Sequence, residues 1–565
     1  MGKGWRAVFW GMGVASGLLA CGAQHDAQPR WTGPVSVVLV HTADLHSHVF
    51  PEPTLISATD ARRGLGEAGA VQAIGGLARI ATLVNGIRST EAHSLYLDSG
   101  DLIEGTDAFT AFSGEPEMRA LSALHVAAVA LGNHDLDPGV PEFLAKHREF
   151  ARFPVLAANY AAPSSGLGGA LAPYVILNAG GVRIGVIGVA NPDSPGGLAL
   201  GDNPYGISLS PLAEAVQSAV DTLRPAVDLI VAITHLGLEG DEAMIRGTSG
   251  LDVVLGGHQH LTMDEALTRF DCAAALRAER GCHARRVFLV HSGAYGRYVG
   301  RIQLSLSPSS ASASDGADGA DGLEVVTATH SLLPVSTAVP EDPALGALLE
   351  PYRARLSAAG FDAPVAFATG PLPRYGAAGG DSALGDLIAD ALRARAGTAV
   401  ALLNTTGIRA DLPPGVLSKS SFASALPFGD TLTVLQLSGS QLSTLFEKQA
   451  QLAGARDCVS PFQGSGFSLT ISCRPGSASH AAKLRVAGKA VDPAATYNLV
   501  TTDYLADNGA GFDAHLSKRA PLGAETDPLN VVLDSLGPRS RCGSPALPCL
   551  DPRALADGRI TVSGD

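Results

Sequence analysis

The sequence predicts an α/β protein with two unequal domains, and three observations support this. The chain has 565 residues, of which 46% are hydrophobic, and that length exceeds what one hydrophobic core supports. In the first half, short apolar runs alternate with segments of helical pattern such as 212–223, which is typical of a layered α/β domain. A second series of strands and helices begins at Phe361, after a predicted helix at 344–359. We therefore expect a larger domain, a connecting helix and a smaller domain.

The elements of each half follow from hydrophobic patterning. In the first half, strands are expected at 35–40, 94–97, 125–131, 182–189, 228–233 and 251–255, with helices at 77–89 and 212–223. The low-complexity stretch 307–322 predicts a loop or hairpin extension before a strand at 323–326. In the second half, helices are expected at 382–396 and 440–449, and strands at 399–403, 432–437 and 497–500.

The first twenty residues have the pattern of a secretory signal peptide. Lys3 and Arg6 precede an apolar run at 7–20, which is too short to span a bilayer. The run ends in Leu18-Leu-Ala-Cys21, which resembles the bacterial lipobox, where the cysteine becomes the lipid-bearing N-terminus. The alternative is an ordinary cleavage site with an incidental cysteine. We expect a tether at 21–34 and an exported, lipid-anchored protein, periplasmic or on the bacterial cell surface, whose lipid is its only membrane contact.

The other six cysteines fall into three local pairs and show no C-x-x-C spacing. In an exported protein such pairs are typical of disulfides that close loops. Six cysteines allow 15 connectivities, so local pairing is a preference rather than a deduction. The pairs are Cys272 with Cys282, Cys458 with Cys473, and Cys542 with Cys549.

The charge of the chain argues against a nucleic-acid polymer as partner. Without Lys3 and Arg6, 38 basic residues stand against 54 acidic ones, and no basic run occurs. A small anionic substrate is compatible with this charge, because a bound metal can dominate the local field.

Five of the predicted strands of the first half, all except 182–189 and 323–326, end in side chains that can bind metal. Ligands of α/β sheets gather outside the carboxyl ends of the strands, so we expect all five ends at one sheet edge. A single histidine at a strand end is more often structural, and we interpret His41, His48, His125 and His291 in that way. Five coincidences argue for a site. Its residues are Asp44 and His46, Asp101, Asn133 and His134, His235, and His258 and His260.

These side chains offer only oxygen and nitrogen donors, which suit a pair of first-row divalent ions rather than a thiolate site. One carboxylate bridging two ions about 3.5–4 Å apart is the standard arrangement for hydrolysing phosphate esters. Asp101 is the natural bridge, because its strand is expected to lie between the first and third of these strands. His134 can hold a proton near neutral pH, and Asp137 can orient its ring. The pattern predicts a two-metal phosphoesterase.

The motifs resemble those of the calcineurin-like metallophosphoesterases, and in detail those of the bacterial 5′-nucleotidase and UDP-sugar hydrolase family. The resemblance spans nearly the whole mature chain. In the first half it rests on Thr42-Ala-Asp-Leu-His46, Gly75-Gly-Leu-Ala-Arg79, Gly132-Asn-His-Asp-Leu-Asp137 and Gly256-Gly-His-Gln-His260. In the second half it rests on Asn404-x-x-Gly-Ile-Arg409, Leu426-Pro-Phe-Gly429 and Asn508-Gly-x-Gly-Phe512.

The resemblance implies a four-layer αββα metallophosphoesterase sandwich at 35–335, a linker helix at 336–360, a smaller α+β substrate-binding domain at 361–540 and a tail at 541–565. It implies that the second domain rotates about the linker helix. It also implies two divalent ions, drawn from Zn, Mn, Fe, Co or Mg. One would be held by Asp44, His46, Asp101 and His260, and the other by Asp101, Asn133, His235 and His258.

The resemblance further makes His134 and Asp137 the catalytic dyad. In the second domain, Asn404 and Arg409 would contact the substrate, and Phe428 and Tyr504 would clamp the base. Two departures concern this domain. Ala510 replaces an aspartate that holds the ribose hydroxyls in the family. The family's arginines before the helix at 382 are replaced by glycine and alanine at 376–380, and the nearest candidate is Arg374.

The function expected from these residues is hydrolysis of nucleotides to nucleoside and phosphate, with a small-molecule nucleotide as substrate. Alternatives on the same scaffold are a 2′,3′-cyclic nucleotide phosphodiesterase or a UDP-sugar hydrolase. A thiosulfohydrolase is less favoured, because the motifs around Asn404 and Phe428 are those of nucleotide handling. A non-catalytic nucleotide-binding lipoprotein would show decay of the metal set, and none is seen. The oligomeric state stays open.

Overall fold

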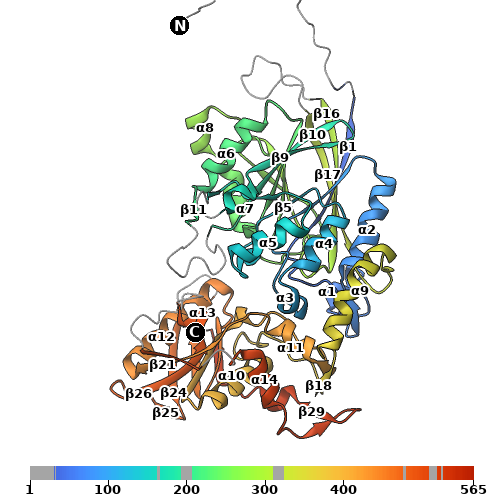
Figure 1. Ribbon diagram of the computed structural model, residues 1–565. Coiled ribbons are helices and arrows are strands. Elements are labelled where there is room, and N and C mark those ends of the chain that lie inside the picture. Colours follow the sequence, from blue (N-terminus) through green and yellow to red (C-terminus); the bar gives the residue numbers. More distant parts are fainter. Residues whose placement is uncertain are drawn as a thin grey trace, which may run out of the picture.

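The computed structural model describes residues 31–564, apart from residue 32 and the segments 162–165, 193–205, 309–322, 475–478, 508–517 and 523–525. The predicted signal peptide, Cys21 and Ala510 therefore lie outside the described residues. The described chain forms a larger and a smaller body (Figure 1).

The larger body is built on two β-sheets. The first has the strand order β17-β16-β1-β4-β5-β6-β8, and the second has the order β14-β15-β13-β12-β10-β9. Strands of the first sheet are β1 (Val35–Thr42), β4 (Ser94–Asp98), β5 (Ala128–Ala130), β6 (Val155–Leu156), β8 (Leu171–Ala172), β16 (Tyr298–Pro308) and β17 (Leu323–Pro334). Those of the second are β9 (Tyr174–Ala179), β10 (Val182–Val189), β12 (Leu229–Thr234), β13 (Val253–Gly256), β14 (Leu267–Phe270) and β15 (Arg286–His291).

A hydrophobic core joins the two sheets face to face. It contains Leu39 and Leu97 of the first sheet together with Val186, Val231 and Leu255 of the second. The outer face of the first sheet packs against α2 (Leu77–Thr90), α4 (Glu115–Ala123) and α5 (Val140–Phe150). The outer face of the second packs against α6 (Leu212–Leu223) and α7 (Gly237–Arg246). This arrangement is the expected four-layer αββα sandwich (Figure 1).

The expectation that all five ligand-bearing strands end at one sheet edge is wrong. β1, β4 and β5 belong to the first sheet, whereas β12 and β13 belong to the second. The first three are parallel neighbours, with β4 in the middle as predicted. β12 and β13 are also parallel and end together, with Thr234 paired to Gly256. Because the sheets stack, the loops that follow the strands of the two sheets meet at one end of the sandwich.

A long hairpin forms one edge of the first sheet, and shorter elements lie around the sandwich. β16 and β17 form an antiparallel hairpin, and the stretch 309–322 between them is outside the described residues. β2 (Glu52–Leu55) and β3 (Val71–Ile74) form a two-stranded ribbon. The remaining elements are α1 (Ala58–Arg62), α3 (Asp107–Phe112), β7 (Tyr160–Ala161), β11 (Ser208–Leu209) and α8 (Ala274–Arg280).

The helix between the domains is α9 (Pro343–Ala358), close to its predicted position. The carboxylate of Asp342 caps it by accepting hydrogen bonds from the amides of Ala344 and Leu345. Its apolar side chains pack on the first domain's core, and the Tyr352 hydroxyl donates a 2.6 Å hydrogen bond to Glu115. The helix is therefore anchored on the first domain.

The smaller body contains three sheets with strand orders β22-β19-β26-β21-β27, β20-β18-β29-β28 and β25-β24-β23-β30. Its strands are β18 (Pro364–Ala368), β19 (Val400–Asn404), β20 (Gly415–Ser418), β21 (Leu432–Ser438), β22 (Phe462–Ser465), β23 (Phe467–Ser472), β24 (His480–Val486), β25 (Lys489–Ala490), β26 (Thr496–Thr502), β27 (Lys518–Pro521), β28 (Arg541–Cys542), β29 (Leu547–Leu550) and β30 (Ile560–Ser563). Its helices are α10 (Ala383–Ala396), α11 (Lys419–Ala425), α12 (Gly439–Gln451), α13 (Asp503–Ala506), α14 (Pro528–Ser535) and α15 (Pro552–Leu555).

The last residues are more than the expected disulfide-pinned tail. β29 runs parallel to β18, and β30 runs parallel to β23, so both belong to the sheets of the second domain. The three local cysteine pairs are disulfide-bonded, which confirms the preferred pairing.

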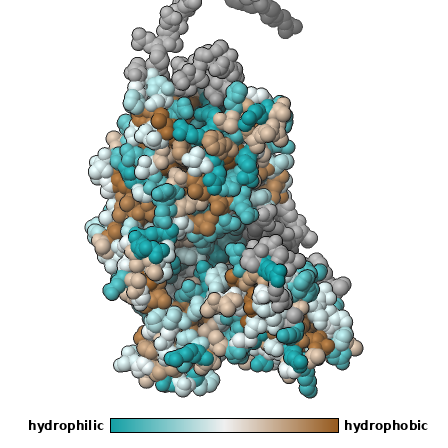
Figure 2. Space-filling view, turned by 180° about the vertical axis from the view of Figure 1, so that it is seen from behind, coloured by the Kyte–Doolittle hydropathy of each residue, from teal (hydrophilic) through white to brown (hydrophobic). Residues whose placement is uncertain are grey.

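On the face shown in Figure 2, hydrophobic residues are scattered among hydrophilic ones rather than gathered in one extended patch. No helix within the described ranges combines the length and apolar character that crossing a bilayer requires.

Candidate metal centre and active site

The loop after β1 turns two of its side chains toward the second sheet. Asp44 and His46 have positive φ angles of 51° and 46°, and both are buried. The Asp44 carboxylate accepts a hydrogen bond from the amide of His258, at 2.9 Å to the nearer oxygen. His46 Nδ1 lies 2.8 Å from the carbonyl of Glu104, which can only accept. That bond places the proton on Nδ1 and leaves the lone pair of Nε2 directed into the site.

Asp101, after β4, lies at the centre of the group. Its Oδ2 is 2.9 Å from His235 Nε2 and 3.6 Å from His46 Nε2. Its Oδ1 accepts the amide of His134 at 2.9 Å. Asp101 thus contacts histidines from both sheets, as the predicted bridge between two ions should.

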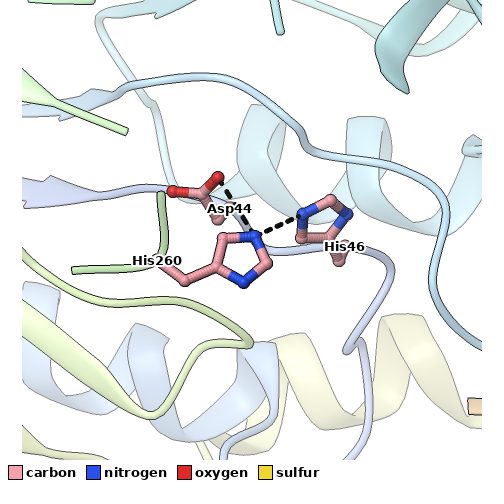
Figure 3. A group of neighbouring side chains, drawn as sticks. All are labelled: Asp44, His46 and His260. Carbon is pink, nitrogen blue, oxygen red and sulfur yellow. Dashed lines mark hydrogen bonds and ion pairs between the residues drawn. The ribbon is translucent and has the colours of Figure 1, made fainter. Parts of the chain in front are cut away.

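Three histidines reach the centre from the second sheet. His235 Nδ1 lies 2.8 Å from the Ser99 carbonyl, which directs Nε2 toward Asp101. His258 Nδ1 lies 3.0 Å from Oδ1 of Asn133. His260 Nε2 lies 3.1 Å from His46 Nε2 and 3.5 Å from an Asp44 oxygen (Figure 3).

The ring nitrogens and carboxylate oxygens of these side chains point toward one another with few hydrogen atoms between them, which is the arrangement that binds a cation. Ligand atoms of Asp44, His46 and His260 lie within 4.8 Å of one another, and so do those of Asp44, Asp101 and His235. The first group contains three of the four ligands expected for one ion. The second contains two of the ligands expected for the other ion, Asp101 and His235, together with Asp44.

The electrostatics of the site favour the neutral form of three of its imidazoles, those of His46, His258 and His260. Burial and the neighbouring Arg409 hold the pKa of His46 and that of His260 well below their ordinary range. Burial, followed by His235, lowers the pKa of His258 to about 4. Neutral imidazole is the form that binds metal. Burial works to raise the pKa of Asp101, but His235 and His134 outweigh it and hold that pKa well below its ordinary range.

The two side chains of the predicted dyad are in contact, and a third carboxyl group lies beside them. His134 Nδ1 lies 2.6 Å from Asp137 Oδ2, and also 2.7 Å from Oε2 of Glu104. Burial lowers the pKa of His134, but Glu104, Asp101 and Asp137 together raise it well above its ordinary range. Burial and Asp137 raise the pKa of Glu104. Sequence reasoning missed Glu104, because a lone glutamate after a Gly-Asp pair matches no motif.

Asp135 is a second residue that sequence reasoning left without a role. Its carboxylate accepts the amides of Asp101, Leu102 and Gly132 at 3.2, 2.9 and 2.8 Å. It therefore ties the loop after β4 to the loop after β5. The motif Gly132–Asp137 contained the signal, since an aspartate three residues after a glycine can accept that glycine's amide.

Two predicted substrate residues of the second domain reach the metal centre. Arg409 Nη2 lies 3.1 Å from His46 Nε2, and the Phe428 ring lies 5.7 Å from the His134 ring. Arg374, the nearest candidate for the missing arginines, donates a 2.7 Å hydrogen bond to the Arg409 carbonyl. The second domain therefore sits against the site.

The other two predicted substrate residues lie farther out. Asn404 ends β19, where its amide donates a 3.0 Å hydrogen bond to Thr406, and it lines a small pocket with Phe428 and Asp430. Tyr504 in α13 is 39% exposed. Of the histidines interpreted as structural, His41 lies 3.2 Å from His330, and His291 lies 2.9 Å from Asp241; neither belongs to the metal-binding groups found among the described residues.

Both halves of the chain match known protein families. Residues 37–261 match the calcineurin-like phosphoesterase family, and residues 364–517 match the 5′-nucleotidase C-terminal domain. The chain is 28% identical to a 5′-nucleotidase of Bos taurus over 449 residues, covering 74% of this chain and 73% of that protein. It is 26% identical to a snake venom 5′-nucleotidase of Naja atra over 464 residues, covering 78% and 81%.

A solved structure is similar over almost the whole length. The 5′-nucleotidase precursor from Thermus thermophilus superposes with a TM-score of 0.77 at 26% identity, covering 94% of this chain and all of that one. The chain therefore belongs to the 5′-nucleotidase family of metal-dependent phosphoester hydrolases, in which a calcineurin-like phosphoesterase domain is followed by a 5′-nucleotidase C-terminal domain.

Proposed function

We propose that the protein is an exported, lipid-anchored 5′-nucleotidase, which uses two divalent ions to hydrolyse nucleotides to nucleoside and phosphate. One observation carries the proposal. The second domain brings a guanidinium and an aromatic ring, those of Arg409 and Phe428, to the cluster of metal-binding groups. A phosphate at the cluster would meet the guanidinium, and a base attached to it would meet the ring.

The residues present fit two divalent ions. His235 Nε2 is buried and forms no hydrogen bond of acceptable geometry within the described chain, although it lies 2.9 Å from Asp101. His258 Nδ1 and the Asn133 oxygen lie 3.0 Å apart, a separation at which both could bind the same cation. We assign one ion to Asp44, His46, Asp101 and His260, and the other to Asp101, Asn133, His235 and His258. Bound ions would polarise the phosphoryl oxygens and supply a hydroxide nucleophile near neutral pH.

The remaining chemistry falls to the chain's own side chains. Asp137 and Glu104 occupy Nδ1 of His134, so its Nε2 is the nitrogen free to stabilise the phosphoryl group or protonate the leaving 5′-oxygen. Arg409 offers a bidentate donor to a phosphate oxygen pair. Phe428, with Tyr504 as the proposed second ring, would stack on the base, and stacking accepts purines and pyrimidines alike.

Export is supported by the lipobox-like stretch ending at Cys21 and by the disulfides, which form and persist in oxidising compartments. The similar protein from Naja atra is named a snake venom enzyme.

The decisive experiment is a phosphate-release screen of the metal-supplemented protein. It should include nucleoside mono-, di- and triphosphates, 2′,3′-cyclic nucleotides, UDP-sugars and bis(p-nitrophenyl) phosphate. We expect 5′-monophosphates to give the highest kcat/KM. Cyclic nucleotides or UDP-sugars as best substrates would replace the proposal with one of the alternatives on this scaffold.

The matched variant for the screen is Asp101→Ala, which should abolish activity through loss of both ions. Metal analysis should find about two ions per chain in the wild type, the number expected of a two-metal hydrolase. Full activity of Asp101→Ala would contradict the assigned centre.

A further inference from the structure

Glu104 links the two catalytic parts of the site. It is 4% exposed and has a left-handed backbone, with φ of 70°. Its amide donates to Ser47 Oγ at 3.1 Å, and its carbonyl accepts from His46 Nδ1 at 2.8 Å. The main chain of Glu104 is therefore held to the Asp44–Ser47 loop at both polar groups, which fixes where its side chain begins.

The side chain of Glu104 extends in the other direction, to the dyad. Its Oε2 lies 2.7 Å from His134 Nδ1, almost as close as Asp137 Oδ2 at 2.6 Å. A ring nitrogen carries one proton, so two carboxylates stand ready to accept one hydrogen bond. The Asp137 contact has the geometry of a hydrogen bond, whereas Oε2 of Glu104 lies at ion-pair distance from the same nitrogen and is buried without a hydrogen-bond partner within the described residues.

We propose that Glu104 is a positioning residue that shares with Asp137 the task of holding His134 Nδ1. The inference rests on the proposed role of His134 and deepens it. Two carboxylates on neighbouring loops, the loop after β4 and the loop after β5, keep the orientation of the ring when either one is removed. Because the Glu104 carbonyl also accepts a hydrogen bond from His46, the same residue fixes the position of the dyad relative to a proposed metal ligand.

This arrangement predicts redundancy, which a double-mutant cycle measures directly. The variants are Glu104→Ala, Asp137→Ala and the double variant, with His134→Ala as the reference for complete loss. Each single variant should lose less than about tenfold in kcat. The kcat of the double variant should fall at least about tenfold further than the product of the two single losses, which corresponds to a coupling of about 1.4 kcal/mol. Its kcat should approach that of His134→Ala. KM should change less than about threefold, because the ring does not bind the nucleoside.

Two further variants separate positioning from packing. Glu104→Gln keeps the shape and one acceptor oxygen, so its kcat should lie between that of the wild type and that of Glu104→Ala. Glu117→Gln is the matched control for disturbance of the loop, because Glu117 in α4 is similarly buried, at 1% exposed, also contacts Ser47, and forms no ion pair with His134 in the described structure. It should leave kcat within about twofold of the wild type, as expected of a residue outside the chemistry.

Several outcomes would overturn the inference. Additive losses in the cycle would show that Glu104 and Asp137 do not share His134. Loss of the catalytic ions from Glu104→Gln would make Glu104 a support of the metal site alone, and loss of an additional ion would make the trio a metal site. If His134→Ala turns over normally, the proposed function of the dyad fails instead, which the reference variant reveals independently.

Discussion

At the scale of single residues, the site is built from backbone conformations that most residues avoid. Asp44, His46, Asp101, His258 and His260 have φ angles of 51°, 46°, 53°, 79° and 56°. Each left-handed non-glycine residue costs about 1–3 kcal/mol and persists only where its surroundings determine it. Here the surroundings are hydrogen bonds from the facing loops. Strain at five proposed ligands is the cost of aiming short side chains at a common point.

His134 should be separable from the metals. His134→Ala removes a proton donor but no proposed ligand, so we expect two bound ions and a loss of about 10²- to 10⁴-fold in kcat. Metal analysis and steady-state kinetics on one preparation check both parts. Normal turnover would show that the ring is only structural.

Cys21 is the residue on which the proposed membrane anchor depends. Cys21→Ser removes the only atom that the lipid-transfer reaction can modify, so the variant should remain uncleaved or appear in the soluble fraction. Membrane fractionation with mass spectrometry of the N-terminal peptide measures this. A wild-type N-terminus without acyl chains would refute the anchor.

The side chains proposed as ligands could be predicted from the sequence because each follows directly after a buried strand. Glu104 and Asp135 could not be assigned in the same way. Asp135 accepts hydrogen bonds from backbone amides, and Glu104 contacts the rings of His46 and His134 through its carbonyl and its carboxyl group. These groups come together only after the loops have folded. The spacing of residues along the chain does not predict such contacts.

At the scale of secondary structure, periodicity identifies strands but not their partners. The runs before His235 and His258 are as apolar as those before Asp44 and Asp101, because all are buried on both faces. Nothing in their composition separates the two sheets, so the sequence alone predicted one edge. β29 and β30 were missed for the same reason, since each is a four-residue strand completed by a distant partner.

Asp135 tests how far the ligand loops depend on one another. Asp135→Ala would leave the amides of Asp101, Leu102 and Gly132 without an acceptor, and each buried unpaired group costs about 1–3 kcal/mol. We expect lower thermal stability of the first domain and partial loss of metal. Asp135→Asn, which keeps one acceptor oxygen, should be milder. Equal stability of Asp135→Ala and wild type would show that water replaces the carboxylate.

At the scale of the whole molecule, the candidate active site lies where the two domains meet. β1 begins at the end of the first domain far from the second, and its other end carries Asp44 toward the junction (Figure 1). A tether before residue 35 would therefore hold the protein by the end opposite its active site. A cavity of about 510 Å³ lies at the junction, lined by both domains, among others by Tyr295, Arg374 and Arg409.

Two carboxyl groups at this junction predict that domain closure depends on pH. Glu52 in β2 accepts a 3.2 Å hydrogen bond from Ser424 in α11, and Asp107 in α3 faces Ser420 of the same helix. Burial raises the pKa of Glu52 to about 7 and that of Asp107 to about 6, the latter with a contribution from Glu52. Two other titratable groups face Glu52. His48 lies 3.5 Å away, and burial lowers the pKa of its ring to about 4, so it is neutral in the closed form; Arg297 lowers the pKa of Glu52.

If the second domain rotates away, both carboxyls become solvated and return to ordinary values near 4.5 and 3.8. The closed form then binds more protons than the open form between those values and about 6 to 7. Closure is therefore most favourable on the acid side and weakens as the pH rises through the raised pKa values. Small-angle scattering should show a more compact average shape at about pH 5.5 than at about pH 8, on either side of the raised pKa values. Glu52→Gln with Asp107→Asn should remove that difference, whereas Glu142→Gln should keep it, because Glu142 on α5 is half-exposed and does not line the junction cavity. A pH dependence unchanged in the double variant would assign the effect to other groups.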